Sequence, residues 1–322
     1  MKYFLILNPG SQSGKSKKRF SQIFGFLDKN GVEYDYQITK DLNDVYEEAV
    51  KANKKNYNVI VAVGGDGTIN KALNGFYDNK GKRISSSKMG VIYTGTSPDF
   101  CKSYDIPYDL TEALEALVKG FSKNINIGKI VLANKQDDEY NGKPVDNSPN
   151  FETKYFGCCV NVGLGAALAR SANGGMRKYL GDFCGTFISL FKVLINYKSN
   201  DFHVLKDGKK EILNKLYNLS VGKTFYIASG IKVKNNLQDG DGRFYNLLVR
   251  NIGLRNIPGC LKGIYSGKEL KNTDVISLDY SKTIEVFGNK QNPEVEFDGD
   301  PQGFLPCKIE MALDPLDIIV RG

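Results

Sequence analysis

The run Asn58-Val-Ile-Val-Ala-Val63 leads directly into Gly64-Gly65-Asp66-Gly67-Thr68, and this stretch decides the fold of the N-terminal part of the chain. The uninterrupted apolar run predicts a strand buried on both faces, and the spacing of Ile69, Leu73 and Phe76 predicts a helix after it. Three glycines within four residues let the backbone approach an anion closely. The unpaired amides and positive dipole end at the start of a helix favour a phosphate. The stretch therefore predicts a phosphate-binding turn.

Two side chains of this turn carry their own expectations. Asp66 would repel a phosphate by charge, so we expect it to meet Mg²⁺, a water on Mg²⁺ or a neighbouring amide. Thr68 can cap the helix or contact a phosphate oxygen. The alternative without function is a plain glycine-rich turn between a strand and a helix.

The segments around this turn alternate between strand and helix patterns up to about residue 127. Helical spacing of apolar residues predicts helices, whereas short apolar or alternating runs predict strands. We expect strands over 3–7, 34–39, 58–63 and 89–93, and helices over about 14–29, around 45–52 and over 111–119. This alternation predicts an α/β domain over 1–127, with a parallel sheet covered by helices on both faces.

Beyond Ile127 the pattern changes to short β-like runs separated by Gly, Asn and Asp clusters. Such runs occur at 130–133, 156–162, 225–227, 244–249, 283–287 and 308–313. They predict a second, mostly antiparallel β-rich domain over 128–311, a sandwich. A packed helix is expected over 179–197, because Asp182 and Lys192 would be costly inside a membrane.

A second turn, Asn8-Pro9-Gly10-Ser11-Gln12-Ser13-Gly14-Lys15-Ser16, is close to a P-loop but does not match one. A P-loop needs glycine five positions before the Gly of Gly-Lys-Ser, and that position is Pro9. What remains is a strand, a turn and a helix, with Ser13, Gly14 and Lys15 expected near a nucleotide.

A third turn, Thr94-Gly95-Thr96-Ser97-Pro98-Asp99, again ends a predicted strand in hydroxyls, glycine and an aspartate. The carboxyl ends of parallel strands meet at one edge of an open α/β sheet, and ligands bind there. We therefore expect the three turns to converge on one ligand.

The composition limits the partners. The formal net charge is +8 and the isoelectric point is near 8.9, which suits nucleotides or anionic lipid surfaces. Nucleic acid is not expected as a partner, since no nucleic-acid-binding motif accompanies the charge. The six cysteines show no paired C-x-x-C spacing and the chain has one histidine, so we expect free thiols in a reducing cytoplasm and no zinc site.

Taken together, these segments resemble the diacylglycerol kinase catalytic family, which includes bacterial diacylglycerol kinases, YegS-like lipid kinases and sphingosine kinases. The family's Asn-Pro-x-Ser-Gly turn is similar to Asn8-Pro9 followed by Ser13-Gly14. Its Gly-Gly-Asp-Gly-Thr-x-Asn signature matches Gly64 through Asn70, and its Gly-Thr-x-Asn-Asp-Phe segment is similar to Gly95 through Phe100. Pro98 replaces the asparagine of that last segment.

The resemblance implies a two-domain kinase in which a nucleotide-binding domain, like that of NAD kinases and phosphofructokinases, precedes a lipid-binding domain. It also implies that the final segment, 312–322, returns to the first domain. From the turns and the resemblance together, we expect ATP at Asn8, Ser13, Gly14, Lys15, Thr39, Gly64, Gly65, Asp66, Gly67, Thr68, Ile69, Asn70, Lys71, Thr94, Gly95 and Thr96.

The resemblance further implies a Mg²⁺ loop and a general base. The loop places the metal at Asp241 with backbone carbonyls of Gln238 and Arg243, although Asp239 is an alternative register. The base would be Asp300, where the family has a glutamate that is one methylene longer. Asp66 and Asp300 are thus the expected catalytic residues.

The function implied is ATP- and Mg²⁺-dependent phosphorylation of a lipid hydroxyl, with diacylglycerol as the family's default substrate. The enzyme would be cytoplasmic, would visit the membrane surface transiently to reach its lipid, and could form a homodimer. Two alternatives stay open: a kinase of a soluble substrate such as NAD, and a lipid- or nucleotide-binding protein with impaired catalysis.

Overall fold

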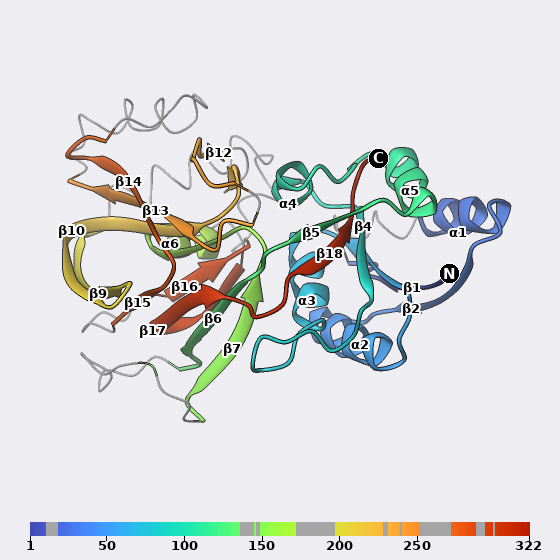
Figure 1. The fold of residues 1–322 in the computed structure, drawn as a ribbon, viewed down its shortest axis with the longest axis horizontal. Coiled ribbons are helices and arrows are strands. Elements are labelled where there is room, and N and C mark those ends of the chain that lie inside the picture. The colour runs from blue at the N-terminus through green and yellow to red at the C-terminus, as the bar shows by residue number, and fades with distance from the viewer. Residues whose placement is uncertain are drawn as a thin grey trace. The chain divides into compact units, whose positions relative to one another are not determined.

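The computed structural model describes residues 1–10, 19–135, 145, 149–171, 197–227, 231–238, 240–251, 272–287, 294–298 and 300–322. The chain divides into two compact units. The first unit comprises Met1–Ile127, Tyr155–Gly157 and Ala312–Gly322, and the second comprises Gly128–Lys154 and Cys158–Met311 (Figure 1).

The first unit is built on a mainly parallel sheet with the strand order β2-β1-β3-β4-β18-β5. Strands β2, β1, β3, β4 and β18 run parallel, whereas β5 pairs antiparallel with β18. The elements are β1 (Lys2–Leu7), α1 (Phe20–Lys29), β2 (Glu33–Ile38), α2 (Leu42–Lys54), β3 (Val59–Gly64), α3 (Asp66–Asn74), β4 (Lys88–Tyr93), α4 (Asp99–Ser103), α5 (Leu110–Lys119), β5 (Ser122–Ile125) and β18 (Leu316–Ile319).

Helices cover this sheet on both faces because its central strands are apolar on both. Every residue of β3 is buried. Leu5, Val61 and Val63 pack in one core cluster with residues of α1 and α5. Helices α2 and α3 contact each other and the central strands, and Figure 1 shows them together, as it shows α1 near α5. The predicted α/β fold with a parallel sheet is confirmed.

The strand order changes direction between β1 and β3. From β1 the chain adds β2 on one side, then crosses to the other side of β1 to add β3 and β4. Open α/β sheets bind their ligands outside the carboxyl ends of the strands at such a switch point. The turns that follow β1 and β3 therefore flank the expected ligand position.

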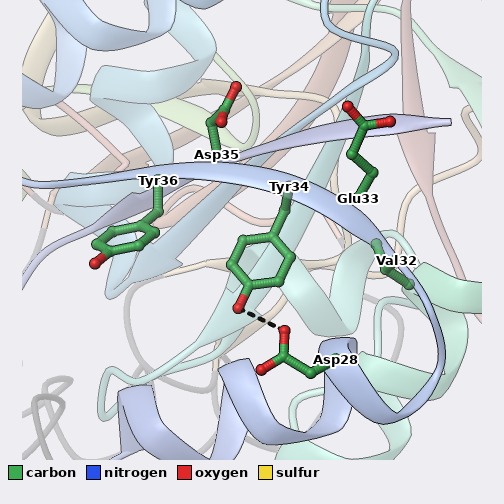
Figure 2. Close-up of a pocket in the computed structure, with 6 residues that line it drawn as sticks. All are labelled: Asp28, Val32, Glu33, Tyr34, Asp35 and Tyr36. Carbon is green, nitrogen blue, oxygen red and sulfur yellow. Dashed lines mark hydrogen bonds between the residues drawn. The ribbon is translucent and has the colours of Figure 1, made fainter.

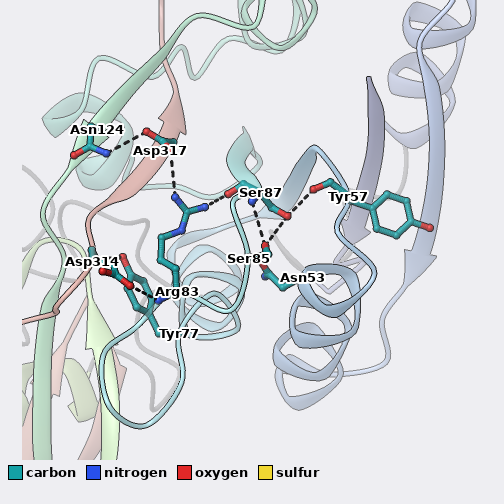
Figure 3. Close-up of polar contacts among 9 residues, drawn as sticks. All are labelled: Asn53, Tyr57, Tyr77, Arg83, Ser85, Ser87, Asn124, Asp314 and Asp317. Atoms are coloured by element: carbon teal, nitrogen blue, oxygen red, sulfur yellow. Dashed lines mark hydrogen bonds and ion pairs between the residues drawn. The ribbon is translucent and has the colours of Figure 1, made fainter.

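The C-terminal strand is tied into the first unit by Arg83 (Figure 3). The Arg83 backbone amide donates to Asp314 Oδ2 at 2.9 Å, and its guanidinium Nη1 lies 3.2 Å from Asp317 Oδ2. Tyr77 Oη donates to the Asp314 carbonyl at 3.0 Å. These contacts hold the segment around β18 beside β4, which extends the parallel sheet by one strand from the end of the chain.

The second unit is rich in antiparallel strands, in the order β14-β13-β10-β8-β16-β17-β15-β9. Because β9 also pairs with β10, part of this sheet closes on itself as a barrel. The remaining elements are β6 (Gly128–Ala133), β7 (Phe151–Phe156), β8 (Cys159–Gly163), α6 (Leu164–Ser171), β9 (Asn200–Lys206), β10 (Lys209–Gly222), β11 (Tyr226–Ile227), β12 (Ile231–Lys232), β13 (Phe244–Arg250), β14 (Ile276–Ser281), β15 (Ile284–Val286), β16 (Glu294–Phe297) and β17 (Asp300–Met311).

The β-rich character predicted for this part of the chain is confirmed, and the closure of the sheet is a feature that the sequence pattern did not indicate. The run 156–162, predicted as one strand, is divided between β7 and β8. The two residues between these strands make side-chain contacts, since Tyr104 Oη donates to the Gly157 carbonyl and the Cys158 amide donates to Asp298 Oδ1.

Two predicted helices fall partly or almost wholly outside the described residues. These are the start of the first helix, at 14–18, and the helix expected over 179–197, except its last residue. In the part of the chain that is described, no helix is long and apolar enough to cross a membrane.

Candidate functional site

Asn8 links the turn after β1 to the turn after β3. Its backbone amide donates to the Val63 carbonyl at 3.0 Å. Its side-chain Nδ2 donates to Thr68 Oγ1 at 2.8 Å, and its Oδ1 accepts from the Gly10 amide at 2.9 Å. Three separate bonds therefore hold this asparagine at the switch point of the sheet.

The Gly64–Thr68 turn is closely packed on itself. A Cβ added to Gly64 would lie 2.3 Å from Thr68 Oγ1, so only glycine lets the helix begin so close to the strand. Gly65 is the N-cap of α3 and Asp66 is its first residue. Thr68 is buried, and its hydroxyl is engaged by Asn8. The first turn of α3 therefore opens at the carboxyl end of β3, as the sequence predicted.

Asp66 is joined to the third turn through Tyr93, the last residue of β4. Tyr93 Oη donates to Asp66 Oδ2 at 3.0 Å, and the same oxygen accepts from the Ser97 amide at 2.7 Å. Burial, followed by the nearby charge of Asp66, raises the pKa of Tyr93 well above its ordinary value, so the phenol stays protonated and acts as the donor. Tyr93 belongs to none of the motifs that predict the site from the sequence.

Thr39 and Thr94 are placed by neighbouring strand ends. The Thr39 amide donates to the Leu7 carbonyl at 3.0 Å, and its hydroxyl is 3.3 Å from the same oxygen. The Thr94 amide donates to the Gly64 carbonyl at 2.8 Å. Both threonines are buried. Hydrogen bonds thus connect each strand end to that of its neighbour in the sheet, in the order β2, β1, β3 and β4.

Gly95 lies close to the turn after β3. A Cβ at Gly95 would lie 2.4 Å from Tyr93 Oη and 2.9 Å from the Gly65 Cα. Thr96, by contrast, is exposed. The first and third predicted turns, at Gly64–Thr68 and Thr94–Asp99, therefore meet, while the Thr96 side chain remains accessible.

Two of the residues expected at ATP have structural contacts of their own. The side chain of Ile69 is buried in the core, and its amide donates to the Gly65 carbonyl at 3.0 Å. Asn70 is buried and its Nδ2 donates to the Tyr155 carbonyl at 3.1 Å. Lys71 is half-buried on the same helix. The contacts of Ile69 and Asn70 stabilise α3 and its packing.

A positive charge is held beside the third turn. Arg19 Nη1, at the start of α1, donates to the Tyr93 carbonyl at 3.4 Å. Ser13, Gly14 and Lys15, expected at the nucleotide, lie outside the described residues.

The loop expected to hold a metal is occupied by an ion pair. Asp241 Oδ1 accepts from Arg243 Nε at 2.7 Å, and Asp241 Oδ2 accepts from Arg243 Nη2 at 2.7 Å. These bonds from Arg243 lower the pKa of the Asp241 carboxyl. The Gln238 carbonyl, a second expected ligand, accepts from the Asp241 amide at 3.0 Å.

A divalent cation on the Asp241 oxygens would have to displace the guanidinium, because two cations in contact on one carboxylate repel each other. The contacts of Gln238, Asp241 and Arg243 therefore do not fit a resident metal in this loop. Asp239, the alternative, lies outside the described residues, and among those that are described no cluster of three His, Cys, Asp or Glu side chains could hold an ion.

Asp300, the expected general base, is the first residue of β17. Its backbone is paired antiparallel with Phe297, the last residue of β16. Asp298, the residue after β16, has φ +50°, and its Oδ1 accepts from the Cys158 amide at 2.9 Å. Asp298 is thus held by the residue that precedes β8.

A surface pocket is distinct from this arrangement. It lies along the first part of β2 and is lined by Asp28, Val32 and residues 33–36, with Tyr34 Oη donating to Asp28 Oδ1 at 2.9 Å (Figure 2). The carboxyl end of β2, at Ile38, is not part of its lining. The candidate site is therefore formed by strand-end turns and not by this pocket.

Comparisons with known proteins agree with the motifs. Residues 2–130 match the family model of the diacylglycerol kinase catalytic domain. Diacylglycerol kinases of Staphylococcus aureus strains RF122 and MRSA252 are each 26% identical over 324 aligned positions, covering 98% of this chain and 93% of theirs.

Solved structures show the same fold. A diacylglycerol kinase from Bacillus anthracis strain Sterne has a TM-score of 0.67 at 19% identity and covers 99% of this chain and 96% of its own. A second structure from that strain, provisionally assigned to the same activity, has a TM-score of 0.74 at 20% identity, with 99% and 95% covered. The N-terminal part of this chain, residues 2–130, therefore belongs to the diacylglycerol kinase catalytic domain family.

Proposed function

We propose that this protein is a lipid kinase that transfers the γ-phosphoryl group of ATP to a lipid hydroxyl, with diacylglycerol as its substrate and phosphatidic acid as its product. The observation that supports this most is the position of Asp66. It begins α3 at the topological switch point, linked through Tyr93 to the third turn, within a domain of the diacylglycerol kinase catalytic family.

On the nucleotide side, this chain supplies positioning and charge. Phosphoryl transfer needs little covalent chemistry from a protein, so catalysis depends on orientation and on neutralising the phosphates. The amides at the start of α3 and the residues expected at ATP would hold the phosphates, with Arg19 as a nearby cation. Mg²⁺ enters in this proposal as part of the substrate MgATP, with Asp66 as the carboxylate that faces it.

On the acceptor side, we retain Asp300 as the general base. Aspartate accepts a proton as glutamate does, and its shorter side chain must be compensated by a closer approach of the hydroxyl. No step is assigned to a metal at Asp241, because Arg243 engages that carboxylate. A lipid substrate also requires contact with a membrane surface, and the net charge of +8 favours one that is anionic.

The substrate class is tested with labelled ATP, Mg²⁺ and single acceptors in mixed micelles. The acceptors are diacylglycerol, a sphingoid base, phosphatidylglycerol and a polyprenol, with NAD in a parallel aqueous reaction. We expect label in the lipid phase with diacylglycerol, at a higher kcat/KM than with the other lipids. Transfer to NAD alone would overturn the assignment to lipids, and ATP binding without transfer to any acceptor would indicate a non-catalytic protein.

A further inference from the structure

Tyr93 connects two of the turns at the site through a single oxygen atom. Its hydroxyl donates to Asp66 Oδ2 at 3.0 Å and accepts from the Ser97 amide at 2.7 Å. Because the Ser97 N–H occupies the acceptor side of the oxygen, the hydroxyl proton is directed toward Asp66. The hydroxyl thus has a fixed donor and a fixed acceptor, which restricts its rotation.

The ring of Tyr93 is immobilised as well. The side chain is 5% exposed, and its backbone is paired with Gly64 on the neighbouring strand. The absence of a side chain at Gly95 makes room for the phenol, since a Cβ there would lie 2.4 Å from its oxygen. A rigid donor aimed at one carboxylate oxygen restricts that carboxylate to one orientation.

We propose that Tyr93 is a positioning residue that holds the Asp66 carboxylate in its reactive orientation. This inference rests on the proposed function, because it assigns Tyr93 a role in the phosphoryl transfer that Asp66 supports. Tyr93 does not touch the substrate in this proposal. It acts through Asp66, and it couples the orientation of that carboxylate to the conformation of the turn at Ser97.

A purely structural tyrosine provides the comparison. Tyr3 is 4% exposed, and its hydroxyl donates to the Leu117 carbonyl at 2.9 Å. It lies at the amino end of β1, whereas the candidate site lies at the carboxyl ends of the strands. Replacing either tyrosine by phenylalanine removes one buried hydroxyl from the same unit. Only the change at Tyr93 removes a bond to the carboxylate of the site.

The test compares Tyr93→Phe with Tyr3→Phe in the lipid-kinase assay, with full ATP and lipid titrations. A hydrogen bond to a charged group corresponds to a rate factor of about 10- to 100-fold. We expect Tyr93→Phe to lower kcat by such a factor while the KM for ATP changes by less than about threefold, because the bond matters most in the transition state. Tyr3→Phe should keep kcat within about twofold of wild type after correction for folded fraction.

A double-mutant cycle adds a readout that does not depend on activity. The shift in thermal midpoint caused by Tyr93→Phe is measured once in the wild-type background and once in the Asp66→Asn background. The shift caused by Tyr3→Phe is measured in the same two backgrounds. We expect coupling to Asp66 for Tyr93 and none for Tyr3. If Tyr93→Phe does not fold, Gly95→Ala, which displaces the ring and keeps the hydroxyl, replaces it and should also lower kcat.

The outcomes separate the two proposals. Unchanged kcat in Tyr93→Phe, with active wild-type protein, would overturn the positioning role and leave the kinase assignment intact. An inactive wild type that still shows coupling between Tyr93 and Asp66 would overturn the kinase assignment and leave the contact established. A loss of kcat equal to that of Tyr3→Phe would reduce Tyr93 to a packing residue.

Discussion

At the scale of single residues, the site depends on positions where no side chain fits. Gly64 faces Thr68, whose oxygen would lie 2.3 Å from an added Cβ and whose hydroxyl is already bonded to Asn8. Thr68 cannot move away without losing that bond. The close approach of β3 to α3 therefore requires glycine at this position.

The first residue-scale prediction concerns Gly64→Ala. Overpacking at a buried site costs about 1–3 kcal/mol, so we expect a loss of that size in the free energy of unfolding, measured in urea. Because the Asn8–Thr68 bond must yield, the affinity for ATP should fall as well, as measured by titration calorimetry.

Gly25→Ala is the matched control, since an added Cβ in that exposed helical position meets nothing within 4 Å. Alanine is favoured over glycine inside a helix by about 0.5–1 kcal/mol, so this variant should gain stability and keep its ATP affinity. Equal changes of the free energy of unfolding and of the ATP affinity in the two variants would contradict the requirement for glycine at position 64.

Single residues also show what sequence reasoning can reach. The turn that contains Gly64, Asp66 and Thr68 could be predicted, because a glycine cluster between an apolar run and a helical pattern is typical of a turn between a strand and a helix. Tyr93 could not, since an aromatic residue at a strand end is an ordinary core residue. Its role depends on a partner 27 positions away, and only the packing of β3 beside β4 brings the two together.

At the scale of elements, the loop before β13 carries its own counter-ion. Asp241 and Arg243 form a two-bond ion pair, with side chains 19% and 46% exposed. Such an arrangement supplies the charge that a metal would otherwise bring. The resemblance to the kinase family implied a metal on Asp241 and on the backbone carbonyls of Gln238 and Arg243, and it assigned no role to the Arg243 side chain.

The element-scale prediction concerns this loop and Mg²⁺. In wild-type protein, adding or chelating Mg²⁺ should leave the thermal midpoint unchanged, because Arg243 holds the carboxylate. Arg243→Ala frees Asp241, so its midpoint should be lower without metal and should rise when millimolar Mg²⁺ is added. Differential scanning calorimetry without nucleotide measures both.

Arg321→Ala is the control, as Arg321 forms an exposed ion pair with Glu112 at 2.6 Å in the first unit. The thermal midpoint of that variant should not change when Mg²⁺ is added. The opposite result would be a thermal midpoint that rises with Mg²⁺ in wild-type protein and does not change with Mg²⁺ in Arg243→Ala. It would mean that the metal binds with the arginine in place, and that Arg243 is not a substitute for the metal.

At the scale of the whole molecule, the order of elements was easier to predict than their pairing. The strands and helices of the α/β part follow from apolar periodicity, and the parallel sheet follows from their alternation. The pairing of β9 with β10 and β15, which closes the barrel, joins segments as far apart as residues 206 and 284. No local pattern specifies such contacts. The β18 strand, placed beside β4 by Asp314 and Asp317 on Arg83, depends equally on distant partners.

The central claim is that the protein transfers the γ-phosphoryl group of ATP to a lipid and that the turn containing Asp66 takes part in this transfer. One measurement tests this claim most directly. Wild-type protein, Asp66→Asn and Asp28→Asn are compared for transfer of labelled phosphate from ATP to diacylglycerol in micelles, with folding verified by circular dichroism. Asp28 is an exposed aspartate beside β2 and serves as the control for a lost carboxylate. We predict labelled phosphatidic acid with wild type and Asp28→Asn, and a rate at least about 100-fold lower with folded Asp66→Asn. Wild-type rates in Asp66→Asn would contradict the claim.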